Sequence, residues 1–313
     1  MIVTFILLCV TAAPALTVYV STSDQATMGG VTFGRGDVVA YNMERDLARL
    51  YFDHTRFRAS DGTLESVQTI DGIHLISSDS FLLSTSATAQ LGQPLVTFSD
   101  GDIVRYAKDT DTAATLQRES SMFWRWNGRK WLPSTQENVD ALARLENGHI
   151  LLSTAGTANV GSNRLAIGID DVAEYDPVAG SASILLDGKD VFFDSQGNAT
   201  GGGNVDGISV DELNGVLYFS TGSLAYVHGT PATLLKVNPG DIVAYNLTSR
   251  TASIFLSKDV FVSRCGTDNI DGLSIVGFAA SAVAAIPEPA TIVGAGLGLV
   301  GIGGYLRRRK QAA

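Results

Sequence analysis

Short apolar runs bounded by polar turn residues dominate the chain, and the same runs recur at nearly regular intervals. In the first repeated element an acidic turn is followed by alternating β-branched residues and a Tyr, which is typical of a strand with one buried face. Its four copies are "GDVVAYN" at 36–42, "GDIVRYA" at 101–107, "DDVAEYD" at 170–176 and "GDIVAYN" at 240–246. Their tyrosines are separated by 65, 69 and 70 residues, so the chain contains four copies of one unit.

Three further elements repeat in step with the first. One ends in Ser-Thr, one carries a central Asp, and one follows each Tyr after a polar turn. Their copies are "VYVST", "FLLST", "ILLST" and "LYFST"; "TIDGI", "NVDAL", "NVDGI" and "NIDGL"; and "LARLYF", "AATLQ", "ASILL" and "ASIFL". Each is rich in β-branched or aromatic residues, so each is predicted to be a strand. We expect an extra short strand or packed loop between the second and third strands of every copy.

Four strands per unit, joined by short turns, predict an all-β fold. The most favoured architecture is a four-bladed β-propeller of antiparallel repeats of about 65–70 residues, over residues 16–276. The N-terminus supplies strands two, three and four of a blade, and the C-terminus supplies only a first strand around Asp271. Together they would form the fourth blade and close the ring without exposed edge strands. The alternative is an irregular two-sheet sandwich.

The N-terminus is uncharged as far as Asp24. An apolar run at 2–10 is followed by the small residues of Ala13-Pro14-Ala15, the pattern of a secretory signal peptide without its basic n-region. We therefore predict a signal peptide at residues 1–15. The alternative is a buried first strand.

A second apolar segment, residues 290–306, contains no charged residue and precedes Arg307, Arg308, Arg309 and Lys310. As a helix it would be about 25 Å long, slightly short of the ~30 Å hydrocarbon core, and arginine side chains reaching the interface can cover the difference. We predict a transmembrane helix whose basic end lies in the cytoplasm. The alternative is a buried core helix. Residues 277–286 are expected to form a tether.

Charge separates the tail from the rest of the chain. Residues 287–313 hold four basic residues and one acidic residue, so the remainder has 18 basic and 31 acidic residues and a net charge of −13. Such an acidic body is a poor partner for nucleic acid. After removal of the signal peptide Cys265 is the one remaining cysteine, so no internal disulfide is expected.

Pro287-Glu288-Pro289, the apolar segment and the terminal arginines together resemble the PEP-CTERM sorting signal. This resemblance covers residues 287–313. It implies that exosortase, a membrane protease of Gram-negative bacteria, recognises and cuts the tail. The precursor would lie in the inner membrane, and the body would then pass to the cell surface or extracellular matrix of an exopolysaccharide producer. The alternative is an uncut tail that keeps the protein anchored in the membrane.

The first strands carry an aspartate in every copy: Asp71, Asp140, Asp206 and Asp271. First strands line the channel of a propeller, so these carboxylates are expected to form a ring that could hold a hard cation such as Ca²⁺. "VDAL" and "VDGI" resemble the first strands of the haemopexin-like four-bladed propeller, whose blades surround a channel ion. The alternative is that each Asp caps the backbone at its strand's start. No other cofactor is expected.

The stretch "MFWRWNGRKWLP" at 122–133 departs from the repeat and contains all three tryptophans, Trp124, Trp126 and Trp131, together with Arg125. Exposed Trp beside Arg suits carbohydrate stacking or binding of an anionic polymer. A longer hairpin whose tryptophans pack on a blade is equally compatible with the sequence.

Two classes of function fit these features. The first is a non-enzymatic, exported surface or matrix protein that binds exopolysaccharide or surface proteins, or that has a structural role. The second is a secreted propeller hydrolase or lyase acting on sugars or lactones. The second requires an asymmetric acid–base pair at the channel, for which His74 and the Asp ring are the candidates.

Overall fold

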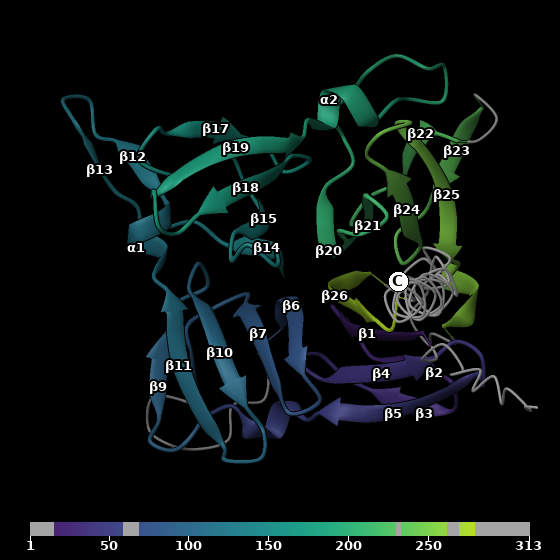
Figure 1. Cartoon of the computed structure of the whole chain (residues 1–313), viewed down its shortest axis with the longest axis horizontal. Helices are drawn as coiled ribbons and strands as arrows, with labels where there is room; N and C mark the ends of the chain where they lie inside the picture. The colour runs from purple at the N-terminus through teal and green to yellow at the C-terminus, as the bar shows by residue number, and fades with distance from the viewer. Residues whose placement is uncertain (1–15, 59–68, 230–232, 262–268, 279–313) are drawn as a thin grey trace, which may run out of the picture. The chain divides into compact units, whose positions relative to one another are not determined.

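The computed structural model describes residues 16–58, 69–229, 233–261 and 269–278, all of which belong to one compact unit, Met1–Phe278. Within this unit four four-stranded antiparallel sheets surround a common centre (Figure 1). The first strands of the sheets lie innermost and the last strands outermost. The predicted four-bladed propeller is confirmed, and the two-sheet sandwich is wrong.

Each blade has the same antiparallel order, from the inner strand to the outer one. The closing blade consists of β26 (Ile270–Val276), β1 (Thr17–Thr22), β4 (Val38–Asn42) and β5 (Leu47–Phe52). Blade 2 consists of β6 (Ile70–Ser77), β7 (Ser80–Thr85), β10 (Ile103–Ala107) and β11 (Thr112–Gln117). Blade 3 consists of β14 (Val139–Arg144), β15 (Ile150–Thr154), β18 (Val172–Asp176) and β19 (Ser181–Leu186). Blade 4 consists of β20 (Val205–Asp211), β21 (Val216–Thr221), β24 (Ile242–Asn246) and β25 (Thr251–Leu256).

The closing blade joins the two ends of the repeat region as predicted. β1 pairs with β26 from Thr17 opposite Val276 to Ser21 opposite Gly272. The body continues slightly past the expected boundary at 276, because Phe278 stacks on Tyr218 with ring centroids 5.3 Å apart. The rest of the predicted tether, the signal peptide at 1–15 and the transmembrane helix at 290–306 lie outside the described residues. Within the described ranges, no helix has the length and apolarity needed to cross a bilayer.

A small hairpin separates the second and third strands of every blade, where an extra strand or packed loop was expected. The hairpins are β2 (Ala26–Met28) with β3 (Val31–Phe33), β8 (Ala89–Leu91) with β9 (Val96–Phe98), β16 (Ala158–Val160) with β17 (Leu165–Ile167), and β22 (Ala225–His228) with β23 (Leu234–Val237). Blade 2 is followed by one additional hairpin, β12 (Trp124–Trp126) with β13 (Trp131–Pro133).

One turn of helix follows the last strand of every blade, a feature that the sequence analysis missed. These turns are η1 (His54–Arg56), α1 (Glu119–Met122), α2 (Gly188–Val191) and η2 (Lys258–Val260). Each is followed by a buried phenylalanine: Phe57, Phe123, Phe192 and Phe261. Phe123 forms a β-bridge with Val160, and Phe261 forms one with Met28. These phenylalanines therefore attach one blade to the small hairpin of the next.

The repeated Asp at the start of each third strand links that strand to the helical turn. Asp241 Oδ2 accepts a hydrogen bond from the Asn238 N–H at 2.8 Å, and its Oδ1 accepts one from the Lys258 N–H at 2.8 Å. Equivalent pairs of hydrogen bonds are formed by Asp37, Asp102 and Asp171. These repeated aspartates therefore stabilise the turn before the third strand and the helical turn that follows the fourth.

The inner strands approach one another closely at the glycines that follow the ring aspartates. A Cβ added to Gly207 would lie 2.7 Å from Ser220 Oγ and 2.9 Å from Leu273 Cβ, so neither an alanine nor a larger residue fits without displacing a neighbour. The same Ser220 hydroxyl donates to the Ile270 carbonyl of the closing blade at 2.9 Å. The Ser of the repeated Ser-Thr pair joins adjacent blades in the same way at Ser21 and Ser153.

We expect Gly207→Ala to lower the free energy of unfolding by ~1–3 kcal/mol, because the added methyl group overpacks this contact. Urea unfolding measures the change. Gly156→Ala is the matched control, since a Cβ there meets no atom within 4 Å, and it should alter stability by less than ~0.5 kcal/mol. Equal stability of the two variants would contradict the close approach.

Candidate functional site

The four ring aspartates share one unusual backbone position. In blade 4, Val205 pairs with Thr221 and Gly207 with Ser220, so Asp206 has no partner in the ladder. The same one-residue slip occurs at the other three positions, Asp71, Asp140 and Asp271. A β-bulge re-aims the side chain of its extra residue. All four carboxyl groups are brought near one another by this repeated bulge, and Asp140 shares a hydrogen bond with Asp206.

Asparagine side chains connect the ring carboxyls. Asn138 Nδ2 donates to Asp71 Oδ2 at 3.0 Å, across the boundary between blades 3 and 2. Asn269 Nδ2 donates to Asp206 Oδ2 at 2.5 Å and to Asp271 Oδ1 at 3.0 Å. Asn204 Nδ2, from the residue just before β20, also donates to Asp206 Oδ1. The ring is therefore a hydrogen-bonded network that spans the blades.

Burial controls the protonation of this network. Loss of hydration raises the pKa of Asp71 to about 7, of Asp140 to about 8, of Asp206 to about 6 and of Asp271 to about 9. Negative charge on neighbouring ring members adds to the effect at Asp71, Asp140 and Asp271. Hydrogen bonds from the asparagines work in the opposite direction at Asp71 and Asp206. The ring therefore retains protons near neutral pH.

The ring has the oxygen ligands that a hard cation prefers, but in this structure its oxygens are not close enough together to form a site. Carboxylate oxygens are suitable Ca²⁺ ligands, and the buried Oδ1 atoms of Asn138 and Asn269 have no hydrogen-bond partner. Three ring oxygens do not lie within 4.8 Å of one another; among the described residues the group that does is Asp37, Asp53 and His54. In that group both Asp37 oxygens already accept backbone N–H groups. Ca²⁺ binding at the ring therefore stays a prediction.

His74, the candidate acid–base residue of the enzyme hypothesis, lies on β6 in the inner layer of blade 2. Burial and the positive charge of Arg144 lower the pKa of His74 to about 4. Within the ranges described here, no carboxylate forms an ion pair with His74. The residue is a neutral imidazole at neutral pH, without the acidic partner that the hypothesis requires.

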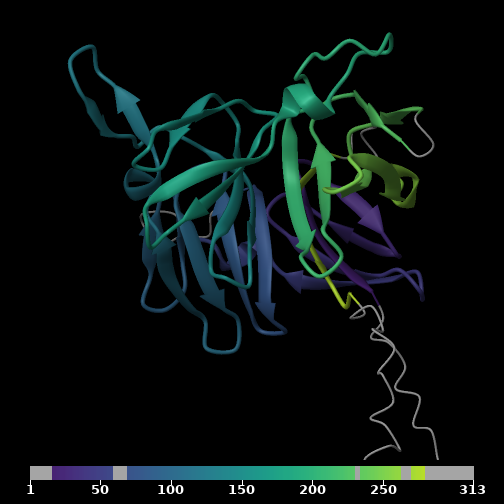
Figure 2. The ribbon, with the colours of Figure 1, turned by 45° about the horizontal axis from the view of Figure 1, so that its top comes forward.

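The tryptophan stretch forms the β12–β13 hairpin, which projects from the adjoining blade (Figure 2). Trp126 and Trp131 are cross-strand partners with ring centroids 5.7 Å apart, and Trp126 is 55% exposed. Trp124 is only partly exposed, and its buried Nε1 has no hydrogen-bond partner. Met122 and Phe123, which were assigned to the insertion, belong to the repeated helical turn and its buried Phe. The hairpin thus presents two of its three tryptophans as a pair.

One arginine contacts this pair, and a second is its neighbour in the sequence. The Arg164 guanidinium lies 5.3 Å from the centroid of the Trp131 ring, a cation–π distance. Arg164 belongs to the turn between β16 and β17, so the tryptophan hairpin contacts the small hairpin of blade 3. Arg125 reaches Gln136 Oε1 at 3.5 Å. Sequence analysis identified Arg125 but missed Arg164, which is distant in the chain.

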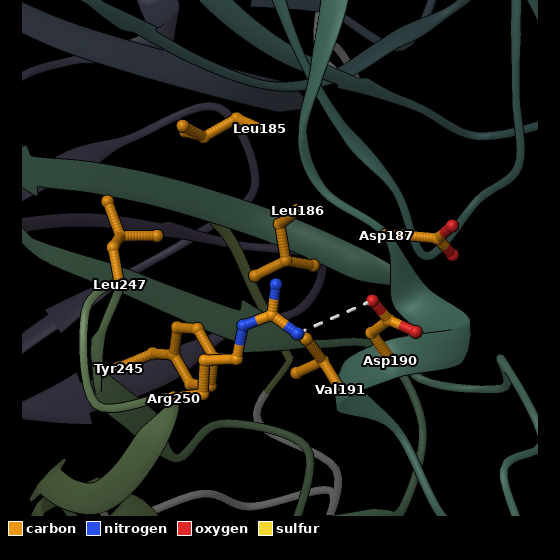
Figure 3. A pocket seen from close by; sticks show the side chains of 8 residues that line it. All are labelled: Leu185, Leu186, Asp187, Asp190, Val191, Tyr245, Leu247 and Arg250. Carbon is orange, nitrogen blue, oxygen red and sulfur yellow. Dashed lines mark ion pairs between the residues drawn. The ribbon is translucent and has the colours of Figure 1, made fainter.

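Two blade junctions at the outer rim each carry an ion pair between a helical turn and the outer β-turn of the next blade. The helical turn supplies the acid in one pair and the base in the other. At the junction of blades 3 and 4, Arg250 Nη1 lies 3.7 Å from Asp190 Oδ2 beside a cavity of about 80 Å³ (Figure 3). At the equivalent junction of the closing blade and blade 2, Arg56 Nη1 lies 3.6 Å from Asp111 Oδ1. All four side chains are substantially exposed, so these pairs contribute little stability.

The C-terminal residues match a known protein-family model. Residues 285–310 match the family model described as the PEP-CTERM protein-sorting motif. The chain carries a PEP-CTERM sorting motif. This PEP-CTERM motif marks an exported protein that exosortase sorts. The sorting residues Pro287, Glu288, Pro289 and Arg307–Arg309 lie outside the described residues.

Comparisons of the whole chain add no function. No curated protein matches the sequence. Among solved structures, the Nidogen/Laminin complex has a chain with 10% identity and a TM-score of 0.37, with 83% of this chain and 98% of that chain covered. A protein of unknown function from Bacteroides caccae has 10% identity and a TM-score of 0.32, with coverages of 84% and 99%. The extracellular domain of a hybrid two-component system from B. thetaiotaomicron has 8% identity and a TM-score of 0.32, with coverages of 83% and 35%.

Proposed function

We propose that the exported PEP-CTERM protein is a non-enzymatic binding protein of the cell surface or extracellular matrix, and that it binds exopolysaccharide through the β12–β13 hairpin. The pair formed by the exposed Trp126 and the partly exposed Trp131 is the observation that carries this proposal. Aromatic faces with a neighbouring guanidinium suit the stacking and hydrogen bonding of sugar rings. The pair belongs to a hairpin that interrupts the repeat after blade 2, whereas most of the repeated polar residues support the fold.

Several polar residues of the repeat already have partners in the fold, whereas the buried Ser84 Oγ and Thr221 Oγ1 have none. The Ser of three Ser-Thr pairs donates to a carbonyl of the next blade, as Ser153 does to Val205 at 2.6 Å. The Asp of each third strand binds two backbone N–H groups, as Asp171 does at 2.7 and 2.8 Å. These uses support a structural role for the repeat and assign recognition to the departures from it.

Replacing Trp126 and Trp131 together by Ala is expected to weaken binding to purified exopolysaccharide by about 30-fold, the equivalent of ~2 kcal/mol. The cause is loss of the stacking surface. Sedimentation of the polysaccharide with the purified full-length chain measures the bound fraction. Val178→Ala is the control, because Val178 is a 96% exposed apolar residue in a different turn. Unchanged binding by the double variant would refute the assignment of the hairpin.

A further inference from the structure

Blade 3 departs from the other blades at the turn before its third strand. The residue before the repeated Asp is Gly36 in the closing blade, Gly101 in blade 2 and Gly240 in blade 4. Blade 3 has Asp170 at this position, directly before Asp171. A carboxylate therefore replaces a hydrogen atom at one of four equivalent positions.

The Asp170 carboxylate is buried and lacks the partners that its neighbour has. Asp171 accepts N–H groups from both Gly168 and Gly188, whereas Asp170 hydrogen-bonds only its own backbone. Asp170 is 8% exposed. Burial, followed by the negative charges of Asp171 and Asp187, raises the pKa of Asp170. A buried carboxylate whose one hydrogen bond is to its own backbone is costly for the fold, which indicates that the residue serves another purpose.

Blade 2 shows what a purely structural acid looks like in the same space. There the small residue is Gly101 and the acid is Glu119, the first residue of the helical turn. Glu119 Oε1 accepts from the Glu137 N–H at 2.5 Å and its Oε2 accepts from Ser99 Oγ at 3.3 Å. In blade 3 the first residue of the turn is Gly188, and a Cβ there would collide with the Asp170 carboxylate. In blade 3 the acidic side chain therefore comes from the turn before the third strand and not from the helical turn. It lacks the two hydrogen bonds that Glu119 accepts in blade 2.

Asp170 lines a cavity of about 430 Å³, which lies within the size range of small-molecule sites. Its polar lining residues are Asn159, Asp171 and Lys189 together with Thr157 and Asp170. Apolar atoms are supplied by Ala158, Ala166 and Ile167 of the β16–β17 hairpin. The lining combines a carboxylate acceptor, an ammonium donor and an amide that can do both. Such a set matches the hydroxyl groups of a sugar.

We propose that this cavity of blade 3 binds one sugar residue of a glycan, with Asp170 accepting hydrogen bonds from its hydroxyl groups and Lys189 donating to its oxygens. The inference rests on the proposed glycan-binding function and extends it to a second contact. The β16–β17 hairpin lines the cavity, and its turn residue Arg164 contacts Trp131. One hairpin therefore borders both the tryptophan pair and the cavity. A glycan chain that follows it would meet a stacking surface and a polar pocket.

NMR titration of the full-length chain with methyl glycosides of glucose, galactose, mannose and N-acetylglucosamine tests the proposal. At least one glycoside is expected to shift the backbone amides around Asn159, Asp170 and Lys189 saturably. Asp170→Gly is expected to weaken this binding by at least ~10-fold. The variant has the residue of the other three blades, so its Tm should be equal to that of the wild type or higher. Asp170→Asn, which keeps the size of the side chain, should weaken binding in the same direction.

The outcomes separate this inference from the proposed function. Absence of a saturable shift with all four glycosides, or wild-type affinity in Asp170→Gly and Asp170→Asn, overturns the cavity site. Trp126→Ala should retain the glycoside shifts while losing affinity for exopolysaccharide. If Trp126→Ala keeps the wild-type affinity for exopolysaccharide, the proposed hairpin site is wrong, and the cavity site is not affected by that result. Loss of glycoside binding confined to the Asp170 variants supports the cavity.

Discussion

In EDTA, the Tm of the protein is expected to fall by at least ~10 °C as the pH rises from about 5 to about 9. The ring aspartates have folded-state pKa values of about 6 to 9, above the ordinary 3.8. A group with a raised folded-state pKa stabilises the fold while protonated and loses this contribution as the pH passes its folded pKa. Each pKa unit is worth about 1.4 kcal/mol, and at this chain length 1 kcal/mol shifts Tm by roughly 2–4 °C.

Asp271→Asn isolates the ring from the other titrating groups. This residue has the most strongly raised pKa of the four, and the substitution keeps its size. At pH 9 in EDTA we expect the variant to melt ~5 °C or more above the wild type, with no difference at pH 4. Calorimetry across the pH range measures both curves. A wild-type Tm that stays constant or rises toward pH 9 would contradict the burial of the ring charge.

The same samples test the Ca²⁺ prediction. A divalent cation at the ring would favour the ionised carboxylates, so millimolar Ca²⁺ should raise Tm at pH 8 if the site exists. The rise should disappear in Asp271→Asn. An unchanged Tm at pH 8 removes the ring as a Ca²⁺ site and leaves it as a proton-sharing network.

Replacing Asp241, the repeated aspartate of a third strand, is expected to lower stability, whereas Asp271→Asn is expected to raise it at pH 9. Asp241→Ala should lower the free energy of unfolding by ~3 kcal/mol and Tm by roughly 6–12 °C, because two N–H groups lose their acceptor. These are the N–H groups of Asn238 and Lys258, both bonded at 2.8 Å. Urea and thermal unfolding at pH 7 measure the loss. Asp190→Ala, which removes an exposed rim ion pair, should cost less than ~1 kcal/mol. A comparable loss in both variants would show that Asp241 does not link the strand to the helical turn.

Much of the architecture follows from the alternation of the repeats. A β-branched residue at the position of Val38 and a tyrosine at the position of Tyr41 recur in every copy, so strand positions and the closure by the strand of Asp271 could be predicted. The period of the repeat does not reveal a one-residue slip in pairing. The bulges at the ring therefore became visible only when each strand had its partner. The buried Phe57, Phe123, Phe192 and Phe261 are a signal in the sequence that could have located the helical turns.

The candidate sites were predictable to different degrees. The ring aspartates were found because they repeat, and Trp126 was found because it interrupts the repeat. Asp170 was seen only as an imperfect copy of the Gly-Asp turn. Its meaning depends on Gly188, which lies across the turn and leaves room for the carboxylate. Arg164 was missed for a similar reason, because its contact with Trp131 joins two hairpins.

The pairing of β1 with β26 also affects the order in which the exported chain can fold. β1 is made early and has to wait for Ile270–Val276 before its blade is complete. During that interval its free edge can pair with other chains. The sorting motif begins at residue 285, just after β26, the strand that completes the closing blade. A chain interrupted before residue 270 would lack both the closing strand and the sorting motif, so incomplete copies would be neither closed nor sorted.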